Sequence, residues 1–265
     1  QEDLDDDGLG DACDPDKDGD GLELHCEPVA AWDLDDARPG VAAPGVAYVT
    51  DGAQLYRVDP NPPYVPQPVA AFTEGDEAVS VLELAIDRCG VLHGVREGAL
   101  LACHPEDGRC WALASLGENA PPQGLSFVDG ALLDGAPADV EFLLGSSGKL
   151  LYRVSEQGGA LEYAPLFEYP ELLTIAGDLL ESEAGVLVSM HDLFEDKLGR
   201  VQGDSFDIVG GLGESENVTG LARAGGQLLG FDGDGTVVVL TPQNGEIAIE
   251  TIATEMSWRG AASRP

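Results

Sequence analysis

The sequence predicts an all-β fold built from five repeats, and three observations agree on it. A strand–turn–strand segment recurs, beginning near residues 46, 91, 141, 186 and 227, with spacings of about 40–50 residues. Each repeat divides into four short apolar strands separated by turn residues. No stretch has a convincing helical pattern. Self-similarity at this period is typical of radial or linear β arrays.

The first repeat shows the pattern, with strands expected at VAYVT, AQLYRV, PVAAF and VLELAID. The turns between second and third strands contain Pro, Asn, Asp and Gly, as in DPNPPY, HPEDGR, SEQGGA and TPQNGE, and these residues favour tight turns. Fourth strands recur as LELAID, GLSFVDG, TIAGDLLE, GLARAG and RGAAS. Five repeats of four strands predict twenty strands in total.

Radial closure suits such an array because it leaves only short, protected edges. Over residues 46–263 the chain resembles the β-propeller superfamily, in particular secreted bacterial propellers with "LYRVDP…G" and "GLAF"-like strands. The resemblance implies a five-bladed β-propeller at residues 37–265. A sixth blade is an alternative if residues 28–45 contribute strands, as are an open β array and a two-sheet sandwich.

The net charge of −36 is concentrated at the N-terminus, where residues 1–36 hold fifteen acidic residues against Lys17 alone, a net charge of −14. Such a surface repels phosphate backbones and anionic membranes and attracts divalent cations, so nucleic acid is an improbable partner. No run of about 18 apolar residues is present, which predicts no membrane insertion. Because Gln1 opens an acidic run without a signal peptide, we expect a processed or excised fragment.

Two twelve-residue windows in this acidic segment have the pattern of a calcium loop. In each window, alternating aspartates precede a glycine (Gly8, Gly21) that permits a sharp turn, the next residue offers its carbonyl, and a final acid closes the site. Calcium takes 6–8 hard oxygen ligands, which this arrangement supplies. The expected ligands are Asp3, Asp5, Asp7, Leu9, Asp11, Asp14, Asp16, Asp18, Asp20, Leu22 and Glu27.

Pro15 and Pro28 flank the second window and disfavour a helix–loop–helix site. The text DLDDDGLGDACDPDKDGDG instead resembles the thrombospondin type 3 repeat, which implies tandem aspartate loops around calcium over about residues 3–27. Leu24 at position nine and Glu27 at position twelve depart from that pattern. We expect residues 1–36 to fold only with calcium, because this much charge opposes collapse. A disordered acidic linker is the alternative.

Five cysteines in a chain with two methionines indicate an oxidising compartment. Cys13 and Cys26 occupy equivalent points of the two acidic loops and could pair. Cys103 and Cys110 flank HPEDGR, a turn that would place them opposite each other. Cys89 is left over, and its pairing with Cys103 or with Cys110 stays open.

Candidate ligand-binding residues lie where the first strand of each repeat ends, because we expect the first strands to line the central channel. His191 and Asp192 are neighbours in a strand and point to opposite faces, so they do not form a relay with each other. The alternative is that all these residues are polar turn residues facing water. The candidates are Asp51, Arg96, Glu97, His191, Asp192 and Asp232.

These observations predict an extracellular or cell-surface, calcium-stabilised protein with a non-catalytic role in binding or adhesion. The expected partner, besides calcium, is a glycan or a surface protein. Two alternatives remain. A secreted glycan-active hydrolase would use channel carboxylates about 5–9.5 Å apart, and a structural subunit of a surface assembly would associate with copies of itself.

Overall fold

The structure, a computed structural model, describes residues 42–133, 135–137, 140–212, 217–243, 246–254 and 256–263. The predicted calcium segment with all its ligands lies outside the described residues, as do Cys13 and Cys26. Within the described ranges the chain is all-β, with one 3-10 turn, η2 (Gly130–Leu132), and no α-helix. The same ranges hold no helix that is long and apolar enough to cross a membrane.

Three separate sheets each contain four antiparallel strands. One has the order β22 (Gly260–Ser263), β1 (Ala47–Thr50), β2 (Gln54–Val58), β3 (Gln67–Ala71). Another has the order β14 (Thr174–Ser182), β15 (Gly185–His191), β16 (Asp196–Gln202), β17 (Ser205–Gly211). The third has the order β18 (Val218–Ala224), β19 (Gln227–Asp232), β20 (Thr236–Gln243), β21 (Glu246–Ala253).

A ten-stranded sheet contains two further antiparallel runs of four strands. The first run is β6 (Glu83–Ile86), β7 (Leu92–Arg96), β8 (Ala99–Cys103), β9 (Arg109–Ser115). The second is β10 (Gly124–Asp129), β11 (Glu141–Ser147), β12 (Leu150–Gln157), β13 (Ala160–Glu168). The pairing of Ala160 with Ser115 joins the outer strands β13 and β9. A short hairpin of β4 (Thr73–Glu74) and β5 (Glu77–Ala78) pairs with β9.

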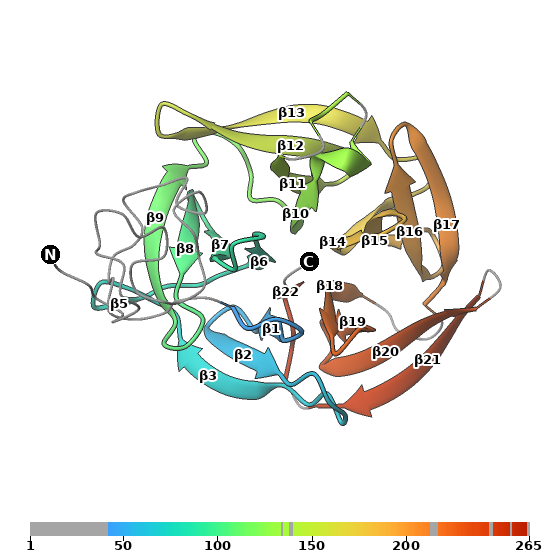
Figure 1. Cartoon of the computed structure of the whole chain (residues 1–265), viewed down its shortest axis with the longest axis horizontal. Helices are drawn as coiled ribbons and strands as arrows, with labels where there is room; N and C mark the ends of the chain where they lie inside the picture. Colours follow the sequence, from blue (N-terminus) through green and yellow to red (C-terminus); the bar gives the residue numbers. More distant parts are fainter. Residues whose placement is uncertain are drawn as a thin grey trace, which may run out of the picture.

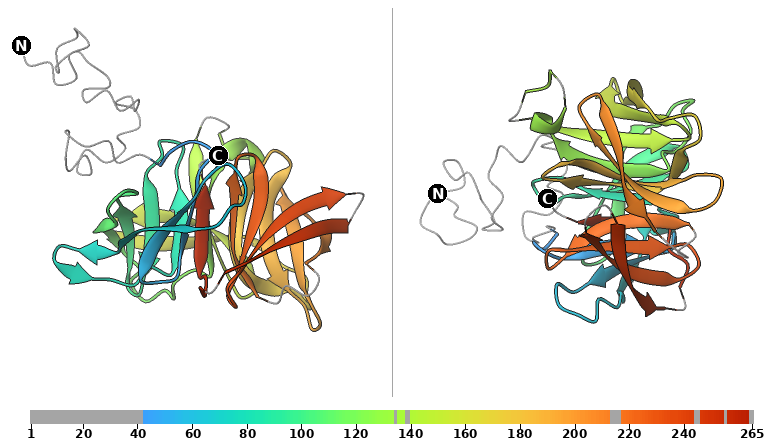
Figure 2. Two further views of the ribbon diagram at one scale, coloured as in Figure 1. Left: turned by 90° about the horizontal axis from the view of Figure 1, so that it is seen from below. Right: turned by 90° about the vertical axis from the view of Figure 1, so that its right-hand side faces the viewer.

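These four-stranded units stand radially around one axis (Figure 1). Their inner strands contact one another in a closed ring, β6–β10–β14–β18–β22 and back to β6. The ring closes because β22, at the end of the chain, pairs antiparallel with β1, near its beginning, from Ala47–Ser263 to Thr50–Gly260. Seen edge-on, the strands run from one face of the ring to the other (Figure 2). Radial four-stranded sheets closed in this way form a β-propeller.

The expectation that the first strand of each repeat lines the axis is wrong. In four units the innermost strand directly precedes the recurring hairpin in sequence, as β6 precedes β7. In the remaining unit the innermost strand is β22, from the end of the chain, which lies inside β1 (Figure 1). The fourth strands of the sequence pattern, such as LELAID and RGAAS, are therefore the channel strands. The sequence does not distinguish the innermost strand from the strand next to it, because both are apolar and buried: all four residues of β1 and all four of β22 are buried.

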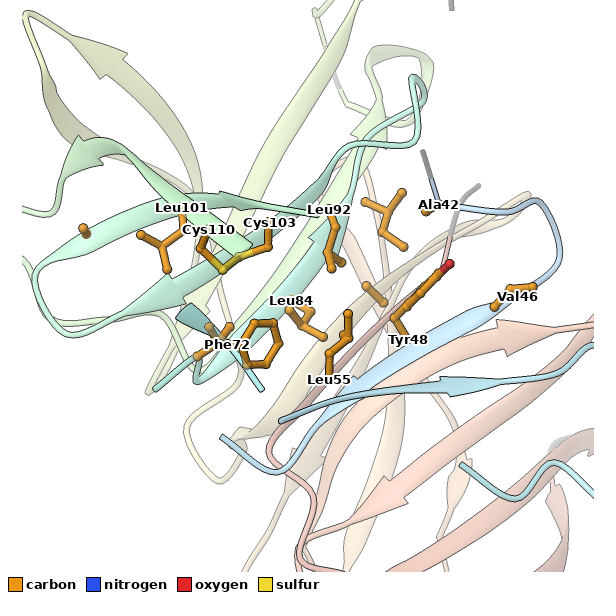
Figure 3. Close-up of a cluster of buried hydrophobic side chains, with 14 residues drawn as sticks. Ala42, Val46, Tyr48, Leu55, Phe72, Leu84, Leu92, Leu101, Cys103 and Cys110 are labelled. Atoms are coloured by element: carbon orange, nitrogen blue, oxygen red, sulfur yellow. A yellow bond between two sulfur atoms is a disulfide. The ribbon is translucent and has the colours of Figure 1, made fainter. Parts of the chain in front are cut away.

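Apolar side chains pack between neighbouring units rather than at the axis. Figure 3 shows the cluster between the sheet of β1 and the strands β6–β9, where Tyr48, Leu55, Phe72 and Leu84 are buried. Alternate residues of each strand point to opposite faces of its sheet, so one unit contributes to the clusters on both sides. This packing fixes the angle between units and positions the inner strands.

Glycine allows the inner strands to approach closely. A Cβ atom on Gly177 of β14 would lie 2.4 Å from Thr219 Cα and 2.5 Å from Val218 O. Both are backbone atoms of the first two residues of β18. On Gly220 of β18, a Cβ atom would lie 2.9 Å from Ala261 Cβ on β22. Both contacts are closer than a side chain tolerates, so these positions require glycine.

Cys103 and Cys110 form a disulfide across the β8–β9 hairpin, as predicted, and it lies within the cluster of Figure 3. Cys89, in the β6–β7 turn, is disulfide-bonded as well. Because Cys103 and Cys110 bond each other, the pairings Cys89–Cys103 and Cys89–Cys110 are wrong.

Candidate functional site at the ends of the inner strands

The predicted ligand residues occupy equivalent turns in four of the units, after β1, β7, β15 and β19, and their contacts are mostly local. Asp51 follows β1, and its Oδ1 accepts hydrogen bonds from the backbone N–H groups of Ala53 and Gln54, both at 2.8 Å. Its Oδ2 accepts one from the Tyr56 hydroxyl at 2.9 Å. Burial, and then the Asp51 carboxylate, raise the pKa of Tyr56 to about 12. Asp51 therefore organises its own turn.

Arg96 and Glu97 form the equivalent turn between β7 and β8. The guanidinium of Arg96 contacts Glu74 of β4 at 3.1 Å and donates to the Glu97 carbonyl at 3.0 Å. In the β19–β20 turn, Asp232 is buried and its Oδ1 accepts from the Asp234 N–H at 2.8 Å. Arg96 thus links its own turn to the neighbouring β4–β5 hairpin, and Asp232 stabilises the turn that contains it.

His191 and Asp192 do not act on each other. His191 Nδ1 lies 2.7 Å from Oδ1 of buried Asp196, across the β15–β16 hairpin. Asp192 Oδ1 instead accepts the N–H groups of Phe194 at 2.7 Å and Glu195 at 3.0 Å. These two backbone hydrogen bonds are the leading cause of its lowered pKa. The sequence argument that these neighbours point apart is consistent with this geometry.

A second set of carboxylates lies where the inner strands β6, β10 and β14 end and where β11 begins. We call these the channel-mouth carboxylates: Asp87, Asp129, Glu141 and Glu181. Both Oε atoms of Glu141 accept the backbone N–H of Arg88, at 3.1 and 3.0 Å. Glu181 Oε2 accepts the N–H of Asp129 at 3.0 Å. Each glutamate therefore reaches from its own unit to the inner strand, or the turn after it, of the preceding unit.

Burial raises the pKa of Glu141 to about 7, opposed by the Arg88 hydrogen bond and supported by the charges of Asp87 and Glu181. Burial also raises the pKa of Glu181. A carboxyl group that exchanges protons near neutral pH can act as a general acid or base. The recurring fourth strands indicate Asp87, Asp129 and Glu181 as strand-end residues. Glu141 was missed, because its role depends on a contact with another unit.

Asp178, on β14, is fully buried at the centre of the ring. Its Oδ1 accepts the N–H groups of Leu179 at 2.8 Å and Leu125 at 3.3 Å. Oδ2 accepts those of Leu221 at 3.0 Å and Ala261 at 3.3 Å. One carboxylate thus bonds to inner strands of three other units. Burial raises its pKa, while the four backbone hydrogen bonds act in the opposite direction.

Sequence reasoning missed Asp178 and also Glu83, which is buried on β6. The signal was present in the recurring inner strands. Asp178 follows Gly177 as Leu125 follows Gly124 and Leu221 follows Gly220, so an acid replaces an apolar residue at one repeat position. In LELAID that position is held by Leu84, and Glu83 holds the preceding one, where the other inner strands have glycine.

Three large apolar side chains are exposed together on the opposite face from the channel-mouth carboxylates. Leu193 is 71% exposed and Phe194 is 87% exposed, at the tip of the β15–β16 turn. Leu172, 68% exposed, precedes β14. The pairing of Thr174 with His191 places the two segments side by side. We call Leu172, Leu193 and Phe194 the apolar tip.

Among the residues that the structure describes, no group of three or more His, Cys, Asp or Glu side chains is arranged to hold a metal ion. The predicted calcium ligands are outside that part of the chain, and their role stays a prediction.

No family model matches the chain, and no curated protein matches it. The solved structures that are similar to it include the following three. The first is a Bacteroides uniformis protein whose suggested activity is that of a 6-phosphogluconolactonase, with 14% identity, 82% of this chain and 71% of that chain covered, and a TM-score of 0.41. The second is the WD40 β-propeller domain of Doa1, with 16% identity, 82% and 68% coverage, and a TM-score of 0.38. The third is BamB from Moraxella catarrhalis, with 13% identity, 84% coverage of both chains, and a TM-score of 0.36.

Proposed function

We propose that the chain is a five-bladed β-propeller preceded by a calcium-binding segment. Three blades correspond to the separate four-stranded sheets, and two come from the ten-stranded sheet. That sheet divides at the Ala160–Ser115 pairing, which links outer strands and leaves each four-stranded run intact. Five inner strands then surround the axis, in agreement with the contacts between them.

We infer that the propeller acts as a non-catalytic binding module at the cell surface or outside the cell, and that the apolar tip contacts a surface protein. The observation that carries this proposal is the exposure of Leu193 and Phe194 on an ordered turn. The two N–H hydrogen bonds to Asp192 hold the turn, and Lys197 Nζ contacts Asp192 at 3.2 Å and Glu195 at 2.7 Å. An apolar pair on an ordered turn loses little conformational freedom on binding.

A surface protein suits the apolar tip better than a glycan does. Adjacent exposed aliphatic and aromatic side chains mark protein interaction sites, and the aspartate beside them is already used within the turn. A glycan remains the alternative ligand, and self-assembly through the same tip is another.

Calcium and an extracellular location belong to the same proposal. The tandem aspartate loops and the net charge of −36 support calcium binding. Disulfides at Cys103–Cys110 and at Cys89 support an oxidising compartment. Calcium would stiffen the segment before the propeller.

A glycan-active hydrolase is the second candidate function, and Glu141 is the observation that favours it. Its pKa of about 7 and the raised pKa of Glu181 suit an acid–base pair at the channel mouth. This hypothesis predicts sugar release that the variant Glu141→Gln abolishes.

The test is adhesion of protein-coated beads to cells of the producing organism, in calcium and after chelation. The variant Leu193→Ser/Phe194→Ser is compared with Leu166→Ser, which alters a 42%-exposed leucine on β13. We expect the tip variant to lose binding, the control to retain it, and protease treatment of the cells to abolish it. Loss on periodate treatment alone would show a glycan ligand instead. Sugar release that requires Glu141 would show the hydrolase, and self-association that the tip variant abolishes would show assembly.

A further inference from the structure

Cys89 lies in the turn between β6 and β7, and it is disulfide-bonded. The chain contains five cysteines. Two of them, Cys103 and Cys110, bond to each other, so neither of them is the partner of Cys89. Within the chain, the partner of Cys89 is therefore Cys13 or Cys26, and both of these belong to the acidic segment of residues 1–36.

The surroundings of Cys89 favour a partner from its own chain over one from another molecule. Cys89 is only 5% exposed, so a cysteine of a second protein could not reach its sulfur without opening the turn. The turn is held by hydrogen bonds, because Asp87 Oδ1 accepts the Val91 N–H at 2.8 Å and the Asp87 carbonyl accepts the Gly90 N–H at 2.9 Å. A buried sulfur in such a turn is accessible to a segment of the same chain that packs against it.

The chain enters the propeller beside this same turn. The Ala42 N–H donates to the Gly90 carbonyl at 2.9 Å, and Ala42 is fully buried in the apolar cluster of Figure 3. Ala42 therefore lies next to the residue that follows Cys89. Cys26 precedes Ala42 by 16 residues (42−26), and Cys13 precedes it by 29 (42−13). Because the entropic cost of closing a loop rises with its length, Cys26 is the favoured partner.

We propose that a Cys26–Cys89 disulfide ties the acidic segment to the propeller, beside Asp87 of the channel mouth. Its formation removes two protons and two electrons from the two thiols, and a disulfide oxidant of the oxidising compartment accepts them by thiol–disulfide exchange and becomes a dithiol. The bond replaces the Cys13–Cys26 pair expected from the sequence, and it leaves Cys13 as the odd cysteine. Bonded cysteines have Cα atoms about 4.4–6.8 Å apart, so the bond would hold residue 26 against the β6–β7 turn.

The tether would give the two faces of the ring different roles. The acidic segment, with its net charge of −14, would be held at the face of the channel-mouth carboxylates, while the apolar tip on the opposite face would stay open to a partner. Like charges at short range repel, so the covalent bond would hold together two acidic surfaces that charge alone would separate. The bond itself requires neither calcium nor a ligand at the apolar tip.

The pairing is tested on the full chain, purified without reductant. Free thiols are alkylated under denaturing conditions, the chain is digested without reduction, and the linked peptides are identified by mass. We expect a peptide with Cys26 bonded to a peptide with Cys89, and an alkylated Cys13. A Cys13–Cys26 pair, or a bond between Cys89 and a second molecule, would overturn the proposal. A Cys13–Cys89 bond would overturn the choice of Cys26.

A second measurement uses substitutions that lie outside the propeller and so leave its core unchanged. A protease site is introduced at residues 37–41, and the cleaved protein is analysed by size exclusion. In the variant Cys13→Ser we expect residues 1–36 to co-elute with the propeller until a reductant is added. In the matched variant Cys13→Ser/Cys26→Ser we expect the segment to separate without reductant. Retention by the double variant, or release from Cys13→Ser without reductant, would contradict the tether whatever the apolar tip binds.

Discussion

Substitution of Gly177 by alanine tests whether the ring depends on close contact between inner strands. The added Cβ would lie 2.4 Å from Thr219 Cα, 2.5 Å from Val218 O and 2.7 Å from Thr219 C. All three are backbone atoms, which cannot rotate away as a side chain can. To restore ordinary contact, β14 and β18 would have to separate by about 1 Å, since carbon atoms pack at roughly 3.5–4.0 Å.

The cost follows from that displacement. Overpacking a dense core costs about 1–3 kcal/mol, and we expect about 3 kcal/mol here because the obstacle is backbone. For a chain of this size that corresponds to a fall in Tm of roughly 6–12 °C. The hydrogen bond from Leu221 N–H to Asp178 crosses the same contact, so its amide exchange should accelerate.

The measurement is urea unfolding followed by tryptophan fluorescence, with Gly211→Ala as the control. A Cβ on Gly211 would meet only the flexible carboxylate of Glu195, at 3.4 Å, so we expect a change within about 0.5 kcal/mol. If Gly177→Ala matched the control in stability and in exchange at Leu221, the inner strands would not be in the contact described.

Two further predictions concern the pH dependence of stability through Glu141 and the contribution of the Cys103–Cys110 disulfide to stability. The folded-state pKa of Glu141, about 7, lies above its unfolded value, so the folded state binds the proton more tightly and the free energy of unfolding falls as pH rises from about 4.5 to 7. Glu141→Gln should remove on the order of 2 kcal/mol of that fall, allowing for the partial exposure of the side chain, and a wild-type slope in urea melts across this range would contradict the assignment. Replacing both Cys103 and Cys110 by alanine opens a loop of seven-residue separation and should lower the free energy of unfolding by about 2 kcal/mol. Reduction of the wild type also breaks the disulfide of Cys89, so it should lower the free energy of unfolding by at least as much, whereas unchanged urea midpoints of the double alanine variant would show that the Cys103–Cys110 bond adds no stability.

The repeated pattern of the sequence was sufficient to predict the all-β class and the recurring hairpins. It also predicted the Cys103–Cys110 bond, because HPEDGR is a local turn whose flanking residues face each other across a hairpin. These features depend on residues close together in the chain. The order of strands within a unit does not, because β22 and β1 pair across almost the whole chain. Both are fully buried, so their composition left the inner and second strands indistinguishable.

The same limit applies to the candidate ligand residues, whose role depends on local geometry that the sequence does not show. Asp51, Asp192 and Asp232 are polar residues at strand ends, and an aspartate there either serves a ligand or accepts the N–H groups of its own turn. The structure places all three in the second role. What distinguishes the two roles is the direction of the side chain, which depends on the turn conformation and is not encoded in the residue type.

The more informative acids are those that break an apolar pattern. Asp178 stands at a position that is leucine in three other inner strands (Leu84, Leu125 and Leu221), and burying a carboxylate there is costly unless the surrounding groups compensate it. Compensation comes from three other units, since the N–H groups of Leu125, Leu221 and Ala261 converge on this side chain only when the ring is closed. Leu125 and Leu221 lie on the two inner strands next to β14, whereas Ala261 lies on β22 and reaches Asp178 across the ring, so an open array would lose at least the Ala261 donor. The same side chain that destabilises an isolated strand therefore favours closure of the ring, which links an exception in the repeat pattern to the architecture of the whole domain.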